Sequence, residues 1–197
     1  MTIIIAMCLY AFTMSITPGP TNIITMTIGV NYGFKKALPF VLGSVLGFTS
    51  LLLVMGFGLG KVAAENELFL QILNYSGAFF ICYMGYKIAR AHPKVNVEKS
   101  SLPGFMQGAI LQWFNPKSWI ATLAGIGAFK LVGKVDQFAL FVVLYIIIGF
   151  LCVLTWAYGG SKIAKLIRND HNLRLFNQIM GIGLIGVAVY LLSLQIH

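Results

Sequence analysis

The sequence predicts an all-α polytopic membrane protein with six transmembrane helices, arranged as two inverted three-helix repeats whose first and fourth helices are broken. Three observations lead to this fold class. Of the 197 residues, 58% are hydrophobic and only 10% are charged, whereas an ordinary soluble domain carries about 25% charged residues. Six long runs are almost free of charge, and prolines interrupt two of them. We therefore expect one transporter domain over residues 1–197, with repeat one at about 1–91 and repeat two at about 102–197.

Each uncharged run is close to or above the length of a spanning helix, about 20 apolar residues. Lys117 is the single charge within the six runs, which cover residues 1–34, 37–60, 68–86, 102–129, 137–161 and 175–197. The first run would be roughly 50 Å long as one helix at about 1.5 Å per residue, against a ~30 Å hydrocarbon core. It therefore either crosses once with a break, which puts both termini outside, or folds back as a re-entrant hairpin, which puts the N-terminus inside.

Prolines break the first run in Thr17-Pro18-Gly19-Pro20 and the fourth run in Asn115-Pro116-Lys117. Proline has no backbone N–H, and its ring clashes with the carbonyl four residues back, so the carbonyls of Met14, Ile16 and Gln112 are freed. Non-helical backbone persists at membrane depth only where it is buried in protein or lines a watery cavity. The paired breaks indicate a binding site, with simple proline kinks as the alternative.

The residues at the breaks also predict where two half-helices begin. Asn115-Pro116 is typical of a helix start, an Asn N-cap before a proline at the first helical position, and Gly19-Pro20 is a weaker version. The first N–H groups of such helices suit a carboxylate, whereas the freed carbonyls suit an ammonium group. Together the breaks can hold a zwitterion the size of an amino acid.

The two halves of the chain resemble each other weakly. The matches are Pro18 with Pro116, Gly47-Phe48 with Gly149-Phe150, Gly58 with Gly160, Gly77 with Gly181, and Tyr86 with Tyr190. Chance matches between glycine-rich helices are the alternative. If the repeat is real, each half holds three spans, so the second half lies upside down relative to the first. Inverted repeats with corresponding broken helices indicate a midplane site and alternating access.

Eight residues at the breaks form the candidate substrate site. An ionisable residue inside the membrane indicates function by default, although Lys117 could also extend to an interface. No carboxylate lies within the runs, so its expected partner is a carbonyl, water or the substrate carboxylate. We expect four residues to shape the site and four to contact substrate: Pro18, Gly19, Pro20 and Pro116, then Asn22, Gln112, Asn115 and Lys117. A site without acids favours a neutral amino acid over a basic one.

The cations gather in alternate loops. Ten of the 14 Lys and Arg residues fall in loops one, three and five, namely Lys35, Lys36, Lys87, Arg90, Lys94, Lys99, Lys162, Lys165, Arg168 and Arg174. Loops two and four carry only Lys61, Lys130 and Lys134. The positive-inside rule makes loops one, three and five cytoplasmic. This distribution accounts for the net charge of +9, so nucleic acid is not an expected partner.

Cysteine and glycine patterns complete the reading. Cys8, Cys82 and Cys152 are scattered, with no CxxC pair or His at ligand spacing, so we expect no disulfide framework, metal site or cofactor. Glycines recur at small-xxx-small spacing in Gly29-x3-Gly33, Gly43-x3-Gly47 and Gly56-x3-Gly60. Such spacing lets helices approach closely, either within the chain or at a homodimer seam.

With Thr17-Pro18-Gly19-Pro20 followed by Asn22, and with Asn115-Pro116-Lys117, the chain resembles the LysE/RhtB family of bacterial amino-acid exporters. The resemblance covers essentially the whole length and includes Phe105-Met106-Gln107-Gly108 before the second break. The segments 73–78, 87–89 and 111–112 look most like the cysteine/O-acetylserine exporter branch. The resemblance implies multi-pass placement in the bacterial inner membrane and efflux driven by the proton gradient. Lys117 is the one candidate proton relay, because His92, His171 and His197 lie in loops or at the terminus. Exchange or facilitated efflux is the alternative to proton coupling.

Three rival functions make different demands on the sequence. A thiol-disulfide electron carrier needs a cysteine on each broken segment, but residues 102–129 contain none. A scaffold subunit needs neither paired breaks nor a buried lysine, and a metal exporter needs carboxylate, His or thiolate ligands at the breaks. We therefore expect an exporter, not an enzyme. Its predicted substrates are small neutral amino acids or derivatives, either cysteine/O-acetylserine or threonine/homoserine-like, and its surroundings are the lipid bilayer.

Overall fold

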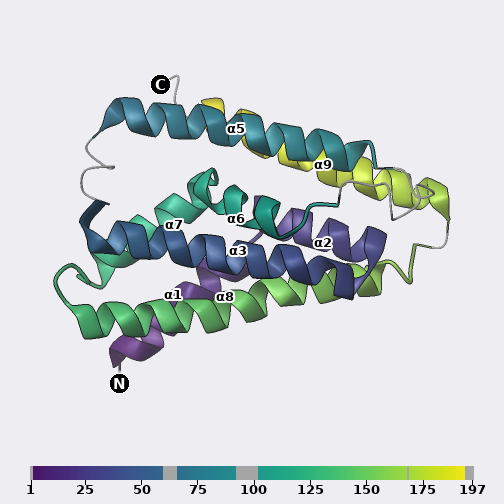
Figure 1. Cartoon of the computed structure of the whole chain (residues 1–197). Coiled ribbons are helices and arrows are strands. Elements are labelled where there is room, and N and C mark those ends of the chain that lie inside the picture. Colours follow the sequence, from purple (N-terminus) through teal and green to yellow (C-terminus); the bar gives the residue numbers. More distant parts are fainter. Residues whose placement is uncertain (1, 60–65, 92–101, 168, 194–197) are drawn as a thin grey trace.

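The computed structural model describes residues 2–59, 66–91, 102–167 and 169–193, and this part of the chain is helical and contains no strand (Figure 1). Predictions that concern Gly60, Lys61, His92, Lys94, Lys99, Arg168 and His197 lie outside the described residues. The helices are α1 (Thr2–Ile16), α2 (Pro20–Tyr32), α3 (Phe34–Val54) with a π-helical turn η1 (Met55–Leu59), α5 (Glu67–Ala89), α6 (Phe105–Trp113), α7 (Pro116–Ala128), α8 (Val135–Ile163) and α9 (Asp170–Ser193).

Three described helices are long and apolar enough to cross a membrane: Phe34–Gly58, Val135–Ile163 and Asp170–Tyr190. The pair α1 and α2 gives a fourth span if it is counted as one bent helix. At the positions of the two remaining expected spans lie α5, with 23 residues, and the pair α6 and α7, with 9 and 13 residues. The predicted all-helical, multi-pass membrane class is confirmed. The full arrangement of six spans in two inverted repeats stays a prediction.

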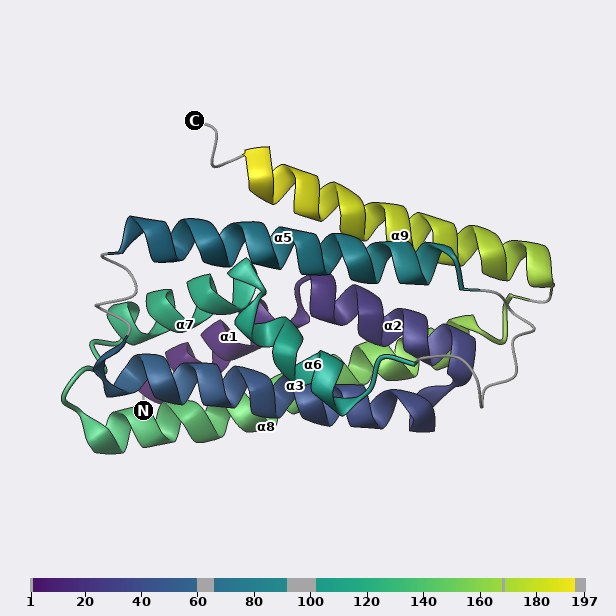
Figure 2. The same cartoon turned by 45° about the horizontal axis from the view of Figure 1, so that its top comes forward.

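The first broken helix bends by 59° between α1 and α2. A bend below a right angle leaves both pieces running in the same general direction, so it favours a broken span over a re-entrant hairpin. Figures 1 and 2 show α1 and α2 following one another away from the N-terminal end, while α6 and α7 follow one another in the opposite direction. Gly33, with φ 86°, then turns the chain from α2 into α3.

Glycines bring three helix pairs into backbone contact. A Cβ at Gly47 of α3 would meet the backbone of Ala109 on α6, and a Cβ at Gly160 of α8 would meet the carbonyl of Met26 on α2. On α5 and α9, Gly85 and Gly181 each face the other's carbonyl. Gly29 and Gly43 make similar close contacts within the chain, so these glycines serve intrachain packing. Each of the three pairs joins one half of the chain to the other.

A buried amide pair ties α2 to α9. Asn31 Nδ2 donates to Asn177 Oδ1 at 2.6 Å, and Asn177 Nδ2 donates back to Asn31 Oδ1 at 2.8 Å. The same Asn177 amide donates to the carbonyl of Ala91, just after α5, at 3.2 Å. Asn177 is fully buried, and because its amide is satisfied from two other segments, it fixes the end of α5, α2 and α9 together.

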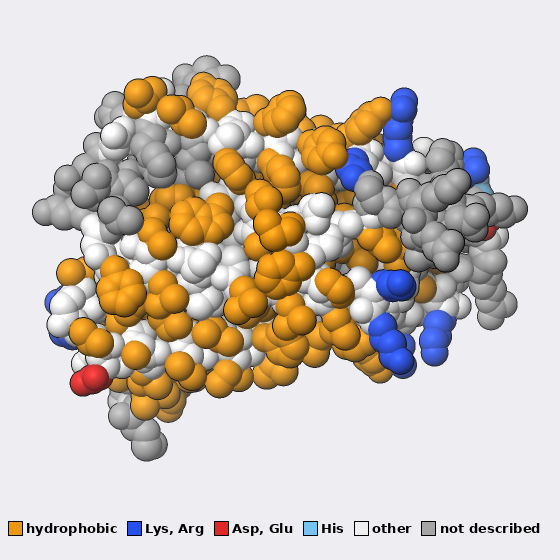
Figure 3. All heavy atoms as spheres, in the orientation of Figure 1, with side chains coloured by type: hydrophobic (Ala, Val, Ile, Leu, Met, Phe, Trp, Pro, Cys, Tyr) orange, Lys and Arg blue, Asp and Glu red, His pale blue; other side chains and the backbone are white. Residues whose placement is uncertain are grey.

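The outer surface is apolar, with charge at its ends. Figure 3 shows hydrophobic side chains over the middle of the visible face and Lys and Arg gathered at the end where α3 begins and α8 ends. Lys35, Lys36, Lys162 and Lys165 are exposed there, whereas Lys130 and Lys134 lie in the turn between α7 and α8 at the opposite end (Figure 1). This asymmetry is the one on which the predicted sidedness rests.

Candidate functional site

Both predicted half-helix starts are found in the structure, with different caps. The helix α2 begins at Pro20, with Gly19 as an N-cap that supplies no side-chain hydrogen bond. The helix α7 begins at Pro116, and its N-cap Asn115 accepts a hydrogen bond at Oδ1 from the backbone N–H of Lys117 at 3.1 Å. The first turn of α7 is therefore capped by its own chain, whereas the first turn of α2 has no such cap.

The two breaks, 98 residues apart in the sequence, meet in space. Lys117 Nζ donates to the carbonyl of Thr17 at 2.6 Å and to its Oγ1 at 2.9 Å, and the carbonyl of Pro18 lies 3.5 Å from the same nitrogen. A second link joins Gln112 Nε2 to Thr21 Oγ1 at 2.8 Å. Of the three expected partners of Lys117, a carbonyl, water or the substrate carboxylate, the structure shows a carbonyl, and it belongs to the other broken helix.

A buried amide network surrounds these links. Asn22 Nδ2 donates to the carbonyls of Ser15 and Thr17 at 2.9 and 2.8 Å. Ser118 Oγ donates to Gln112 Oε1 at 2.7 Å. The side chains of Asn22, Gln112 and Asn115 are only 3–4% exposed. Because every amide here has a partner, the network holds both breaks in one geometry.

All three carbonyls that the prolines free find partners within the chain. The carbonyl of Met14 accepts from Thr17 Oγ1 at 3.4 Å, that of Ile16 from Trp156 Nε1 at 3.1 Å, and that of Gln112 from the backbone N–H of Asn115 at 3.4 Å. The expected carbonyl cluster for an ammonium group at Met14, Ile16 and Gln112 is therefore not the one that holds an amine. That role falls to Thr17 and Pro18, one to four residues further along the first break.

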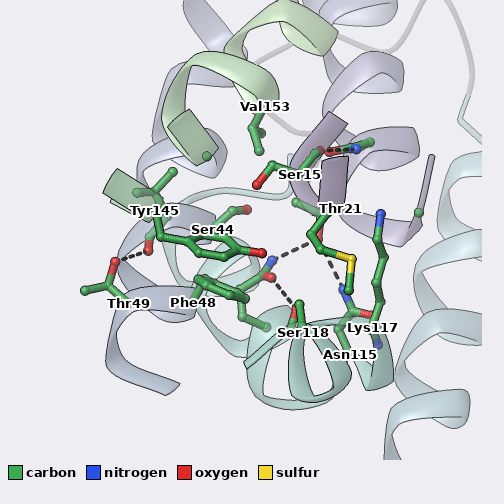
Figure 4. Close-up of a pocket in the computed structure, with 17 residues that line it drawn as sticks. Ser15, Thr21, Ser44, Phe48, Thr49, Asn115, Lys117, Ser118, Tyr145 and Val153 are labelled. Carbon is green, nitrogen blue, oxygen red and sulfur yellow. Dashed lines mark hydrogen bonds between the residues drawn. The ribbon is translucent and has the colours of Figure 1, made fainter. Parts of the chain in front are cut away.

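A cavity lies between the breaks and the middle of α3 and α8 (Figure 4). Together with the solvent in its open mouth it takes in about 570 Å³ of empty space. Five of the eight predicted site residues line it: Gly19, Asn22, Gln112, Asn115 and Lys117. Pro20 and Pro116 are buried at the helix starts, and Pro18 lines a separate apolar groove with Trp156 and Met180.

The wall of the cavity opposite the breaks was not predicted from the sequence. Ser44, Phe48 and Thr49 of α3 and Tyr145 of α8 line the cavity, and the rings of Phe48 and Tyr145 stack 4.4 Å apart. Ser44 and Thr49 bond to carbonyls of their own helix at 2.8 Å. The available signal was polar side chains in the second run and a tyrosine in the middle of the fifth, but a hydroxyl that bonds its own helix is common in any span.

Comparison with known proteins gives the chain a family. Residues 12–195 match the family model described as "LysE type translocator". The chain belongs to the LysE family. This confirms the family expected from the two proline motifs, both of which lie within the matched residues. No solved structure matches the LysE-family chain.

Curated relatives of this LysE-family chain are named after efflux. The chain is 25% identical over 167 residues to a cysteine/O-acetylserine efflux protein of Klebsiella pneumoniae, covering 84% of this chain and 85% of the relative. It is 25% identical over 190 residues to a protein of that name from Escherichia coli, covering 95% and 96%. It is also 24% identical over 176 residues to a homoserine/homoserine lactone efflux protein of Salmonella typhimurium, covering 85% of each. The LysE family is thus one of transporters, and the similarity to the two named classes is nearly equal.

Proposed function

We propose that this LysE-family protein exports small neutral amino acids or their derivatives across the bacterial inner membrane by alternating access. The observation that carries the proposal is the contact of Lys117, in the second break, with Thr17, in the first. Paired helix breaks that meet beside a cavity supply the backbone groups that a zwitterion requires. The efflux names of relatives with similar substrates, cysteine, O-acetylserine and homoserine, support the same function.

The two ends of the substrate would bind on either side of the first break, one at the start of α2 and the other just after α1. The N-terminus of α2 has no side-chain cap, and Thr21 and Asn22 in its first turn line the cavity. Uncapped N–H groups at a helix start favour a carboxylate. The carbonyls of Thr17 and Pro18 favour an ammonium group, because each is an acceptor near the C-terminal end of α1.

The neutral side chain of the substrate would lie against the opposite wall. Phe48, Tyr145 and Val153 supply apolar surface there, while Ser44 and Thr49 supply hydroxyls. None of the 17 described residues that line the cavity is acidic, so a lysine or arginine side chain would lack a counter-ion. Asn22, Gln112 and Asn115 would contact the substrate, and Lys117 would join the second break to the first beside it. Pro18, Gly19, Pro20 and Pro116 would shape the site.

Transport would follow from six spans in two inverted repeats that rock about this midplane site. The lysine-rich end of the molecule would be cytoplasmic, so the loaded carrier would open toward the opposite end. The proton gradient would drive efflux. Lys117 is the only charged residue among those that line the cavity.

The test is counterflow with purified protein in liposomes. Radiolabelled cysteine, O-acetylserine, serine, threonine, homoserine, leucine and lysine would each be offered to vesicles preloaded with the same unlabelled amino acid, with and without a pH gradient. We expect saturable exchange of neutral amino acids and none of lysine. Folded protein that exchanges no neutral amino acid would overturn the proposal. If exchange is seen, its response to the pH gradient decides whether transport is coupled to protons.

A further inference from the structure

We propose that Lys117 is a built-in substitute for the substrate's ammonium group: its Nζ fills the ammonium position while the site is empty, and the substrate displaces it. The inference rests on the proposed function and deepens it. It predicts that the lysine is needed for the return of the empty carrier rather than for binding the amino acid. Lys117 would then set the balance between net efflux and exchange.

The surroundings of Lys117 Nζ suit an ammonium group. A primary ammonium has three N–H donors and no acceptor. Lys117 Nζ has three oxygens around it, the carbonyl and Oγ1 of Thr17 at 2.6 and 2.9 Å and the carbonyl of Pro18 at 3.5 Å. An α-ammonium group carries the same charge and the same three donors, so these oxygens can accept hydrogen bonds from either group.

The ammonium position is preformed on the first break. The carbonyl of Thr17 also accepts from Asn22 Nδ2 at 2.8 Å, which holds this oxygen in place whether or not the lysine is present. Thr17 and Pro18 directly follow α1, whose C-terminal end carries the negative pole of the helix dipole. The position is therefore selective for a cation, and the cation that occupies it comes from the other broken helix.

The side chain of Lys117 can leave the ammonium position. Its side chain is only partly buried and lies across Gly19, where a Cβ would be 3.1 Å from Lys117 Cδ and 3.3 Å from Nζ. A four-carbon stem with three rotatable donors moves at low cost. Gly19 and Lys117 both line the cavity, so an ammonium group that enters it reaches the same oxygens.

The empty carrier therefore needs a cation at the ammonium position. With either cation in place, the oxygens of the first break are satisfied and the two breaks stay joined. With neither, the carbonyls of Thr17 and Pro18 lose the cation that joins them to the second break, and the empty carrier does not return through a closed form. Removing the amine should therefore block net efflux, which needs an empty return step, and spare exchange, in which substrate is bound in both directions.

The experiment measures both modes in liposomes. We expect Lys117→Met to keep exchange within about twofold of wild type while net efflux falls tenfold or more. Lys165→Met, at an exposed lysine outside the cavity, should leave both unchanged. In Lys117→Ala, added ethylammonium should restore net efflux, whereas tetramethylammonium, which has no N–H donor, should not.

Two results for Lys117→Met would overturn the inference. One is an equal loss of exchange and net efflux, which would make Lys117 a direct ligand of the substrate carboxylate, and the other is no loss of either.

A measurement on the wild-type protein covers the case in which the variants do not fold. Acylation of Lys117, read by peptide mass spectrometry relative to Lys165 in the same sample, should increase with ethylammonium or with substrate. Protection by substrate would contradict displacement. Wild-type protein that exchanges no amino acid counts against the proposed function. The effect of ethylammonium on the acylation of Lys117 still tests the cation position in that case.

Discussion

Asn115 has two roles at the second break. Its Oδ1 caps α7 through the backbone N–H of Lys117, and its Nδ2 lies 3.5 Å from Thr21 Oγ1 in the first break. The cap fixes where α7 begins, and this in turn directs the Lys117 side chain toward Thr17. A single amide therefore sets the helix start and the approach of the two breaks.

Asn115→Ala should abolish net efflux while the protein still inserts into the membrane. Loss of an Asn N-cap costs about 1 kcal/mol of stability, which a membrane protein of this size tolerates, but the misplaced α7 start moves Lys117. The matched control is Asn169→Ala, which removes the corresponding cap of α9, where Asn169 Oδ1 accepts from the N–H of Asn172 at 2.8 Å. Equal efflux by both variants, measured in liposomes at equal protein content, would contradict a role for Asn115 in the site.

Thr49 and Thr155 form a second matched pair. Each donates to a carbonyl four residues back in its own helix at 2.8 Å, but Thr49 lines the cavity and Thr155 is exposed on α8. We expect Thr49→Val to change the apparent KM for a hydroxyl-bearing amino acid several-fold, because a wall hydroxyl is lost. Thr155→Val should not change it. A shift of similar size in both variants would mean that helix bonding, not the cavity wall, is responsible.

At the residue scale, the sequence could show the breaks but not the facing wall. Pro18, Pro116 and Lys117 stand out because proline and charge are costly in an apolar run. Ser44 and Tyr145 do not, because either residue is ordinary in a span until the fold places it opposite the breaks. The lack of acids in the uncharged runs left a carbonyl, water or the substrate as the partner of Lys117, but only the meeting of the two breaks in the fold identifies Thr17.

At the element scale, α3 and α6 pack with almost no space between their backbones. Gly43 and Gly47 of α3 face Phe105 and Ala109 of α6, and Gly108 of α6 faces the carbonyl of Phe40. Glycine spacing in the sequence predicted such an approach, but spacing does not identify the partner helix. The turn η1, where Gly58 adopts φ 109°, was not predicted, because its uncharged residues continue the second run without a proline to mark an end.

Gly47→Ala should destabilise the protein by about 1–3 kcal/mol, the usual cost of an added carbon in a tightly packed core. Its Cβ would collide with the backbone of Ala109, which cannot rotate away. Gly186→Ala is the control, because a Cβ there meets nothing within 4 Å and alanine is the better helix former. Thermal unfolding in detergent should give a lower midpoint for the first variant and an unchanged or higher one for the second; the reverse order would contradict the close α3–α6 contact.

At the scale of the whole molecule, the closest helix pairs join the two halves of the chain: α2 with α8, α3 with α6, and α5 with α9. The sequence predicts two halves of opposite direction, and Figures 1 and 2 show the two broken helices running in opposite directions. The weak internal repeat, with three expected spans in each half, could predict the opposite directions of the two breaks. It could not predict the exchange of partners between halves, because that exchange depends on side-chain shapes that meet only in the folded protein.

Single cysteines in a background without Cys8, Cys82 and Cys152 test this orientation. Lys36→Cys and Lys165→Cys should react with a membrane-impermeant maleimide only from the cytoplasmic side, and Lys134→Cys only from outside, because the three lysines are exposed at opposite ends. Labelling of all three from one side would rule out the inverted arrangement. Intact cells and inverted vesicles supply the two sides.

The amide pair of Asn31 and Asn177 has a consequence for synthesis on the ribosome. The partners are 146 residues apart, so at about 5–20 residues per second the second amide is translated roughly 7–30 s after the first. During that interval the side-chain oxygen of Asn31, near the end of α2 and close to Lys35 and Lys36, is without its partner on α9. The contact that joins α2 and the end of α5 to α9 therefore forms only after nearly the whole chain has been made, and a chain that stops before residue 177 lacks it.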